Sequence, residues 1–307
     1  MEKNNKISKD LIGALVLTKD RKKMAEECIK KLLKIKKIKK IILVINGEST
    51  DNYPLSSKYE KNKKVIILEL PKNFGSAGGY KEGLKKALKE KIAWLWLFDE
   101  DCEPLENSFD ELIKAKEFLK RKKEKISYLS SSLKWLDGGN LPIKICLENP
   151  FWAEYLSNSL IEIKWSVFTG LFINMRILKE KDLPKKDLFI YSDDTIFTYN
   201  LSKKGRGFLV GKSKILHKDY SLKRRNYTPI TSNKELLRRT GIYLRNSIYF
   251  SKILIKSKEK NDKKDAIRIF LGSLKNSFMA IINSRRFYYL PLILQFLIRG
   301  LFFNPKD

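Results

Sequence analysis

The first hundred residues alternate short, uninterrupted apolar runs with segments of helical periodicity. The helical segments are residues 24–35 and 83–88. The apolar runs are LIGALVLT (11–18), IILVI (41–45), VIILEL (65–70) and IAWLWLF (92–98). Continuous apolar runs are typical of parallel strands buried on both faces, with helices providing the cover. The sequence therefore predicts an α/β fold with a mostly parallel central sheet and helices on both faces.

The composition describes a folded chain with a basic surface. Of 307 residues, 43% are hydrophobic, and 64 Lys plus Arg against 35 Asp plus Glu give a net charge of +29. These fractions exclude a disordered or collagen-like chain. The three cysteines, Cys28, Cys102 and Cys146, form no CxxC pair. Their spacing argues against a disulfide scaffold or a structural zinc site, and it fits a reducing cytosol.

The last third of the chain differs from the rest in charge and periodicity. We expect a boundary near residue 220, followed by a mainly helical region, 221–307. Between Lys218 and Asp307 there are 20 basic and 6 acidic residues. This region ends in the apolar stretch 287–303 (FYYLPLILQFLIRGLFF), which polar residues and a proline interrupt, so we expect no membrane-spanning helix. Basic clusters beside apolar residues suit a surface of anionic lipid headgroups; a solvated basic face is the alternative.

Polar segments follow each of the four predicted strands. They are TKDR (18–21), NGESTDN (46–52), NFGSAGG (73–79) and DED (99–101). In sheets of this kind ligands bind beyond the carboxyl ends of the strands. No GxGxxG follows the first strand, which disfavours a dinucleotide-binding domain. The four segments together predict a nucleotide pocket.

A metal site is predicted at the end of the fourth strand. Asp99 and Asp101 flank Glu100 there, and two carboxylates suit Mg²⁺ or Mn²⁺ with diphosphate oxygens completing the shell. An acidic turn that merely ends the strand is the alternative. His217 is the only histidine. Imidazole is a good ligand for Mn²⁺-type ions, although a lone histidine is usually structural.

Two further segments contain candidate functional residues. Asp193 and Asp194 are adjacent carboxylates, whose repulsion can raise the pKa of one and make it a proton acceptor near neutral pH. A helix N-terminus explains the pair equally, because Asp is favoured there. Gly75, Gly78 and Gly79 either let the backbone approach a phosphate or sugar, or form a tight strand-to-helix turn.

The order of these motifs resembles that of the family 2 glycosyltransferases, most closely their galactofuranosyltransferase and rhamnosyltransferase branch. The likeness covers roughly residues 11–250. It is carried by TKDR, NGESTD, NFGSAGG, FDED, WSVFTGLFI, LFIYSDD and LHKDYS. The stretch RRTGIYLRNSIYF (238–250) also resembles that branch's helix after the catalytic histidine.

This resemblance implies a GT-A fold over residues 1–220 and an inverting transfer from a nucleotide-sugar donor. It implies that Asp194 is the general base with Asp193 its neighbour, and that Trp165 and Gly170 shape the acceptor side. The metal ligands would be Asp99, Asp101 and His217, holding Mn²⁺ or Mg²⁺. The nucleotide-sugar site would comprise Thr18, Arg21, Asp51, Asn73, Gly75, Gly78, Gly79, Asp99 and Glu100, with the first three facing the base and ribose.

The resemblance leaves the substrates open. Asn200 stands where the family often has Arg, and Lys81 replaces the usual Asn or small residue. We favour UDP-galactofuranose as donor, with dTDP-rhamnose and UDP-hexopyranoses as alternatives. The expected acceptor is a lipid-linked glycan in cell-surface polysaccharide synthesis. Residues 1–10 contain no apolar signal core, so we expect a cytoplasmic enzyme, peripheral at the inner face of the cell membrane.

Two other functions compete with glycosyl transfer. The charge of +29 would suit nucleic-acid binding. We find no RRM, KH or zinc-finger signature, and acidic strand ends repel phosphate in the absence of metal, so we expect no nucleic-acid partner. A nucleotidyltransferase on a similar sheet would lack the later YSDD and LHKDYS segments.

Overall fold

The computed structural model describes residues 11–48, 53–139, 152–218, 234–284 and 287–306. Its first half is a parallel sheet that follows the apolar runs of the sequence. The strands lie in the spatial order β3 (Val65–Leu70), β2 (Ile38–Asn46), β1 (Ile12–Thr18) and β4 (Trp94–Asp99). Their pairing is parallel throughout, so their carboxyl ends meet at one edge.

The second half of the sheet is mixed. From β4 the order continues through β8 (Leu171–Asn174), β6 (Ile126–Trp135), β9 (Arg206–His217) and β5 (Cys102–Pro104), and β7 (Leu160–Ile163) also pairs with β9. Strand β8 is antiparallel to both neighbours, whereas β6 and β9 are parallel. The predicted α/β fold is confirmed, and the parallel character belongs chiefly to its first half.

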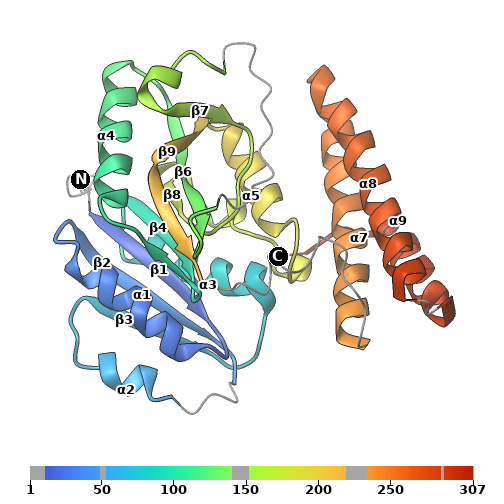
Figure 1. Cartoon of the computed structure of the whole chain (residues 1–307), viewed down its shortest axis with the longest axis horizontal. Helices are drawn as coiled ribbons and strands as arrows, with labels where there is room; N and C mark the ends of the chain where they lie inside the picture. The colour runs from blue at the N-terminus through green and yellow to red at the C-terminus, as the bar shows by residue number, and fades with distance from the viewer. Residues whose placement is uncertain (1–10, 49–52, 140–151, 219–233, 285–286, 307) are drawn as a thin grey trace, which may run out of the picture.

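Helices cover both faces of the sheet (Figure 1). They are α1 (Lys22–Lys34), α2 (Leu55–Tyr59), α3 (Gly75–Lys89), α4 (Ser108–Arg121) and α5 (Asp193–Ser202). Successive strand residues face opposite sides. Ala14 and Val16 of β1 therefore join a core with α1 and α4, while Leu15 and Leu17 join one with α3 and α5.

Short 3₁₀ helices connect several elements. They are η1 (Leu156–Asn158), η2 (Met175–Ile177), η3 (Glu180–Asp182), η4 (Lys186–Leu188) and η5 (Phe287–Tyr289). The segment from η4 to the start of α5 carries the predicted base, and it lies beside the C-terminal helices described next.

Among its described residues, 234–284 and 287–306, the C-terminal region contains three α-helices, and it is mainly helical as the sequence predicts. These are α7 (Lys234–Ile255), α8 (Lys260–Ser284) and α9 (Leu290–Phe302), which lie together on one side of the molecule (Figure 1). A shared core that contains Trp165, Tyr199, Phe250, Leu254 and Ala266 joins α7 and α8 to α5. The boundary predicted at residue 220 falls in 219–233, outside the described residues. Within the described part of the chain, no helix is long and apolar enough to span a bilayer.

Candidate active site

The pairing of β5 with β9 brings together residues that are far apart in the sequence. Antiparallel register places Cys102 opposite His217, directly after the acidic turn of β4. The backbone N–H of Lys218 donates to the carbonyl oxygen of Asp101 at 2.8 Å. As a result the His217 Nε2 atom lies 3.9 Å from Asp101 Oδ1, and both side chains are buried. The predicted convergence of the acidic turn and the histidine is present in the fold.

A candidate cation site is formed by Asp101, Cys102 and His217, whose ligand atoms lie within 4.8 Å of one another. Burial, and then the charge of Asp101, raise the pKa of the Cys102 thiol well above its usual value. The thiol therefore stays protonated and donates to Asp101 Oδ1 at 3.3 Å. This leaves a carboxylate and an imidazole as ligands, a set that fits Mn²⁺ or Mg²⁺ and needs further oxygens from a substrate.

Arg21 already places positive charge at this acidic turn. Its guanidinium lies 2.9 Å from Asp101 Oδ2 and 2.8 Å from Glu100 Oε1. Burial raises the pKa of Glu100 to about 7, and the nearby Arg21 opposes that rise. The backbone N–H of Lys19 also donates to Glu100 Oε2 at 3.2 Å. The acidic turn is therefore a place where positively charged groups bind.

Asp99 faces a different set of partners from Asp101. It accepts hydrogen bonds from the Tyr80 hydroxyl at 2.8 Å and from the Thr169 hydroxyl. Burial, and then the charge of Asp101, raise the pKa of Asp99. Asp99 is not a member of the three-residue cation group. Tyr80 and Thr169 were missed by the sequence analysis, although Tyr80 directly follows the quoted NFGSAGG motif and Thr169 lies within WSVFTGLFI.

The adjacent carboxylates begin α5 and face different surroundings. Asp193 is 3% exposed and accepts from the Ser76 hydroxyl at 2.6 Å; burial, and then the charge of Asp194, raise its pKa to about 8. Asp194 is partly exposed and accepts from the Thr195 backbone N–H at 2.6 Å. Burial raises the pKa of Asp194 to about 6, with the charge of Asp99 adding to the rise and Thr195 opposing it. Asp194 is the accessible carboxylate of the pair, and it is ionised near neutral pH.

The predicted nucleotide pocket has one buried polar group without a partner. The Thr18 hydroxyl, at the carboxyl end of β1, finds no hydrogen bond among the described residues, and the side chain is 1% exposed. An unsatisfied buried hydroxyl costs about 1–3 kcal/mol, which a ligand's polar group would recover. Asn73 follows β3, is exposed, and accepts a hydrogen bond from the Gly75 N–H at 2.8 Å. Asp51 lies outside the described residues.

The glycines after β3 serve close packing of α3. Gly75 has φ +70°, and a side chain there would overlap the carbonyl oxygen of Phe189. A side chain at Gly78 would overlap Phe74, and one at Gly79 would overlap Leu17. This arrangement matches the tight strand-to-helix turn rather than an open approach for a phosphate. Asn46, which the sequence analysis did not single out as a site residue, fixes the turn by donating to the Gly75 carbonyl at 2.8 Å.

The two residues assigned to the acceptor side are both buried. Trp165 is 4% exposed and packs edge-on against Phe250, with ring centroids 5.5 Å apart. Gly170 has φ +75° and accepts from the Ser131 N–H at 3.0 Å and from the Trp96 indole at 3.2 Å. Trp165 thus belongs to the core beneath α7, and Gly170 forms the turn that carries Thr169 toward Asp99.

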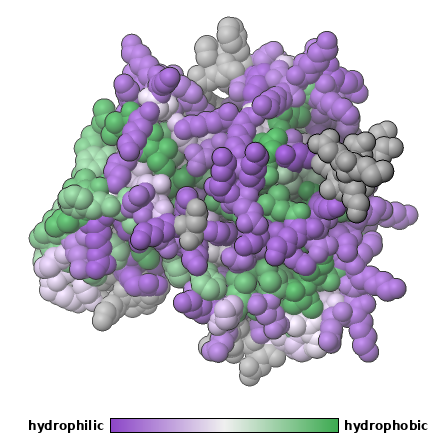
Figure 2. Space-filling model, turned by 180° about the vertical axis from the view of Figure 1, so that it is seen from behind, coloured by the Kyte–Doolittle hydropathy of each residue, from purple (hydrophilic) through white to green (hydrophobic). Residues whose placement is uncertain are grey.

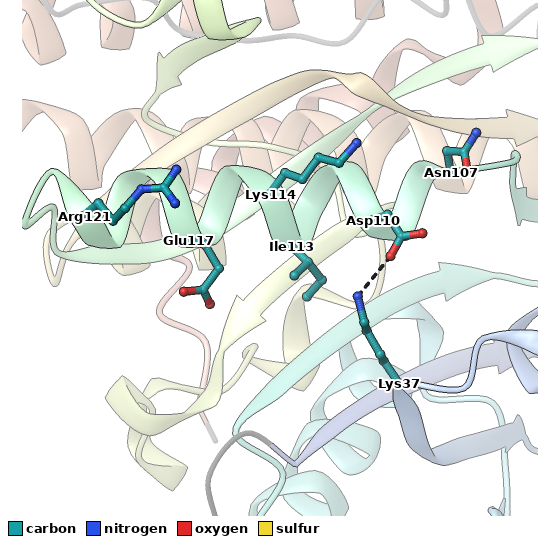
Figure 3. Close-up of a pocket in the computed structure, with 7 residues that line it drawn as sticks. All are labelled: Lys37, Asn107, Asp110, Ile113, Lys114, Glu117 and Arg121. Atoms are coloured by element: carbon teal, nitrogen blue, oxygen red, sulfur yellow. Dashed lines mark hydrogen bonds and ion pairs between the residues drawn. The ribbon is translucent and has the colours of Figure 1, made fainter.

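A separate hollow lies along α4, outside this cluster. Its lining residues are Lys37, Asn107, Asp110, Ile113, Lys114, Glu117 and Arg121 (Figure 3). Lys37 pairs with Asp110 across it at 3.2 Å. The lining includes no residue of the acidic turn, the histidine strand or α5, so the hollow is not part of the candidate active site.

Comparisons with known proteins agree with this fold. Residues 14–121 match the model of Glycosyl transferase family 2, a segment that contains the acidic turn. The crystal structure of S. aureus TarS 1–349 shares the fold with a TM-score of 0.62 at 14% identity, over 94% of this chain and 80% of that one. The same TarS segment in complex with UDP-GlcNAc gives a TM-score of 0.59 at 14% identity, over 94% and 79%. No curated protein matches the sequence.

A mannosyltransferase shares the fold as well. The mannosyltransferase PcManGT from Pyrobaculum calidifontis, in complex with GDP-Man and Mn²⁺, has a TM-score of 0.55 at 11% identity, over 96% of this chain and 87% of that one. These structures show that the present chain has a GT-A-type fold, and the matched segment supports a glycosyltransferase.

Proposed function

We propose that the protein is an inverting, metal-dependent transferase that moves galactofuranose from UDP-galactofuranose to a hydroxyl of a lipid-linked glycan. The observation that carries the proposal is the convergence of the acidic turn, His217 and the start of α5. The motif order favours the galactofuranosyl branch, and rhamnosyl transfer from dTDP-rhamnose is the alternative. Nucleotide-sugar chemistry is supported by the UDP-GlcNAc and GDP-Man complexes of the structurally similar enzymes.

The proposed residues act on two parts of the reaction, the departing diphosphate and the attacking hydroxyl of the acceptor. Asp101 and His217 would hold Mn²⁺ or Mg²⁺, with Asp99 close by; when bound, the ion would stabilise the charge of the departing diphosphate. Arg21 and the orphaned Thr18 hydroxyl would contact the nucleotide portion. Asp194 would accept the proton of the acceptor hydroxyl, because its raised pKa combines a useful ionised fraction with basicity.

A donor panel tests the proposed reaction. Purified full-length protein with Mn²⁺ is incubated with UDP-galactofuranose, dTDP-rhamnose, UDP-GlcNAc or GDP-mannose, and nucleotide release is measured with and without a lipid-linked glycan extract. We expect acceptor-stimulated UDP release from UDP-galactofuranose to exceed the others at least tenfold. Preference for another nucleotide sugar would overturn the donor assignment, and release from none would overturn the proposed function.

The C-terminal helices present a surface suited to a membrane interface. Ile298 and Phe302 of α9 are 57% and 82% exposed, and the hydrophobic surface of this region is visible in Figure 2. Further exposed apolar side chains are Ile267, Leu271, Ile282, Phe287, Tyr288 and Leu301. Exposed Lys275 and Arg299 lie on the same helices. We therefore propose that the enzyme is cytoplasmic and binds the inner face of the membrane through α8 and α9, where it meets its lipid-linked acceptor.

The double variant Ile298→Ser/Phe302→Ser tests this attachment. Burying one large apolar side chain contributes about 1.5–3 kcal/mol, so we expect affinity for phosphatidylglycerol vesicles to fall at least tenfold. Vesicle cosedimentation measures it, with phosphatidylcholine vesicles to isolate the charge contribution. Leu156→Ser is the matched control, since Leu156 is 48% exposed on a different element. Unchanged cosedimentation of the double variant would exclude α9 as the anchor.

A further inference from the structure

The loop before Asp194 has an unusual backbone. Phe189, Tyr191 and Ser192 have φ values of +64°, +67° and +61°. Non-glycine residues rarely adopt this left-handed region, and they keep it only when surrounding contacts hold them there. The loop leads directly into α5, so its shape determines the direction from which Asp193 and Asp194 enter the site.

One side of this loop is held by α3. The Ala77 backbone N–H donates to the Phe189 carbonyl oxygen at 3.1 Å, and the same oxygen lies where a side chain on Gly75 would be. The Ser76 hydroxyl bonds Asp193 at 2.6 Å. These contacts fix the loop near Phe189 and the buried carboxylate, and they leave the carbonyls of Leu188, Ile190 and Tyr191 to other partners.

A single side chain on α7 meets those three carbonyls. The Asn246 Nδ2 atom lies 2.8 Å from the Leu188 oxygen, 2.9 Å from the Ile190 oxygen and 2.8 Å from the Tyr191 oxygen. Asn246 is fully buried. An amide nitrogen carries two hydrogens, so the three contacts include a shared one. The amide thus ties together the carbonyls on both sides of Phe189 and the carbonyl between Tyr191 and Ser192.

Arg245 sets the orientation of that amide. Its Nε donates to Asn246 Oδ1 at 3.0 Å, which turns the amide nitrogen toward the loop. Its Nη2 donates to the Asp187 carbonyl oxygen at 2.8 Å. The guanidinium also stacks 4.0 Å from the ring centroid of Phe303, so packing at the end of the chain supports the pair.

We propose that Asn246, oriented by Arg245, is a positioning residue for glycosyl transfer, acting through the 187–192 loop to aim the Asp194 carboxylate. The inference rests on the proposed function, in which Asp194 is the base. It gives the motif RNSIYF on α7 a role in the reaction, although neither side chain is placed in contact with substrate. Misaiming a base by about 1 Å can cost about 10²-fold in rate.

The test compares Asn246→Ala and Arg245→Lys with the control Ser251→Ala. Ser251 is a buried α7 residue whose hydroxyl donates to the Ser247 carbonyl oxygen at 2.9 Å. With UDP-galactofuranose and Mn²⁺ we expect kcat for UDP release to fall about 10- to 100-fold in Asn246→Ala, and less in Arg245→Lys, which keeps one nitrogen donor at this position. The donor KM should stay within twofold. Ser251→Ala should match the unmodified protein.

A double variant separates aiming from general destabilisation. In an Asp194→Asn background, Asn246→Ala should change residual turnover less than twofold, since the group it aims is already disabled. Equal losses in both backgrounds, or an unchanged kcat in Asn246→Ala, would overturn the inference while leaving the base assignment intact. Full activity of Asp194→Asn would instead overturn the base assignment.

Amide hydrogen exchange tests whether Asn246 holds the 187–192 loop, and this measurement needs no substrate. In Asn246→Ala, exchange over residues 188–196 should accelerate at least tenfold, whereas Ser251→Ala should leave it unchanged. Unchanged exchange in Asn246→Ala would overturn the inference even if the unmodified protein released no UDP and the proposed function had failed.

Discussion

Asp194→Asn should reduce turnover about 10²- to 10⁴-fold while leaving donor binding intact. The amide is nearly isosteric with the carboxylate, and its oxygen can keep the bonds from Thr195 at 2.6 and 3.1 Å. It cannot accept a proton from the acceptor hydroxyl. The loss should therefore appear in kcat, measured as acceptor-stimulated UDP release, and not in the affinity for UDP and Mn²⁺ measured by calorimetry.

The pH dependence supplies a second signature of the same residue. A general base works only when deprotonated, so turnover of the unmodified enzyme should fall as the pH drops through the pKa of Asp194, which burial raises to about 6. Asp194→Asn should lose this acidic limb. Asp110→Asn is the matched control, because Asp110 lies on α4 and pairs with Lys37. Turnover above a tenth of normal in Asp194→Asn would rule out this residue as the base.

The parallel half of the fold could be predicted because its signal is local. Runs such as VIILEL (65–70) are continuous and short, and the structure places β3 at Val65–Leu70. Strand β5 has no such signal, since Cys102–Pro104 is too short to show a pattern. Its pairing with β9 is nevertheless what brings His217 to the acidic turn. The sequence pointed to that meeting only through the resemblance in motif order.

The roles of single residues were harder to predict, because side-chain direction depends on distant neighbours. Asp99 and Asp101 are equivalent in sequence, yet Asp99 bonds Tyr80 and Thr169 while Asp101 faces His217. The glycines after β3 looked open to a ligand, but Phe74, Leu17 and the Phe189 carbonyl fill their bare faces. Neither difference has a periodic or compositional signature.

The backbone before α5 could not be predicted from the sequence either. No residue in LFIYSDD is a glycine, so nothing in the sequence indicated three left-handed residues just before the proposed base. The physical reason appears only with α7 in place, because Asn246 lies 55 or more residues away along the chain and still meets three loop carbonyls. The proposed base is therefore positioned by a long-range contact between the two regions of the chain.

Removing the divalent cation should abolish turnover, and altering its ligands should raise the concentration of Mn²⁺ required. A bound cation can contribute several kcal/mol to a transition state with a departing diphosphate, which corresponds to about 10²- to 10³-fold or more in rate. Excess EDTA should thus reduce UDP release at least 100-fold, and added Mn²⁺ should restore it. Full activity in EDTA would exclude a metal-dependent mechanism.

Asp101→Asn and His217→Gln locate the cation on the chain. Each replaces a strong ligand by a weaker amide, so activity should be partly recovered at high Mn²⁺, with the half-saturating concentration raised about tenfold or more. Cys102→Ser should leave that concentration within twofold, because the high pKa of the buried thiol keeps it protonated and makes it a poor ligand. The Asp110→Asn control should behave like the unmodified enzyme.

If Cys102→Ser raised the Mn²⁺ requirement as much as Asp101→Asn, the thiol would be a ligand. If Asp101→Asn left the Mn²⁺ requirement unchanged, the cation would bind elsewhere. The three variants therefore test each member of the buried group separately, using the one feature of the site that joins β4, β5 and β9.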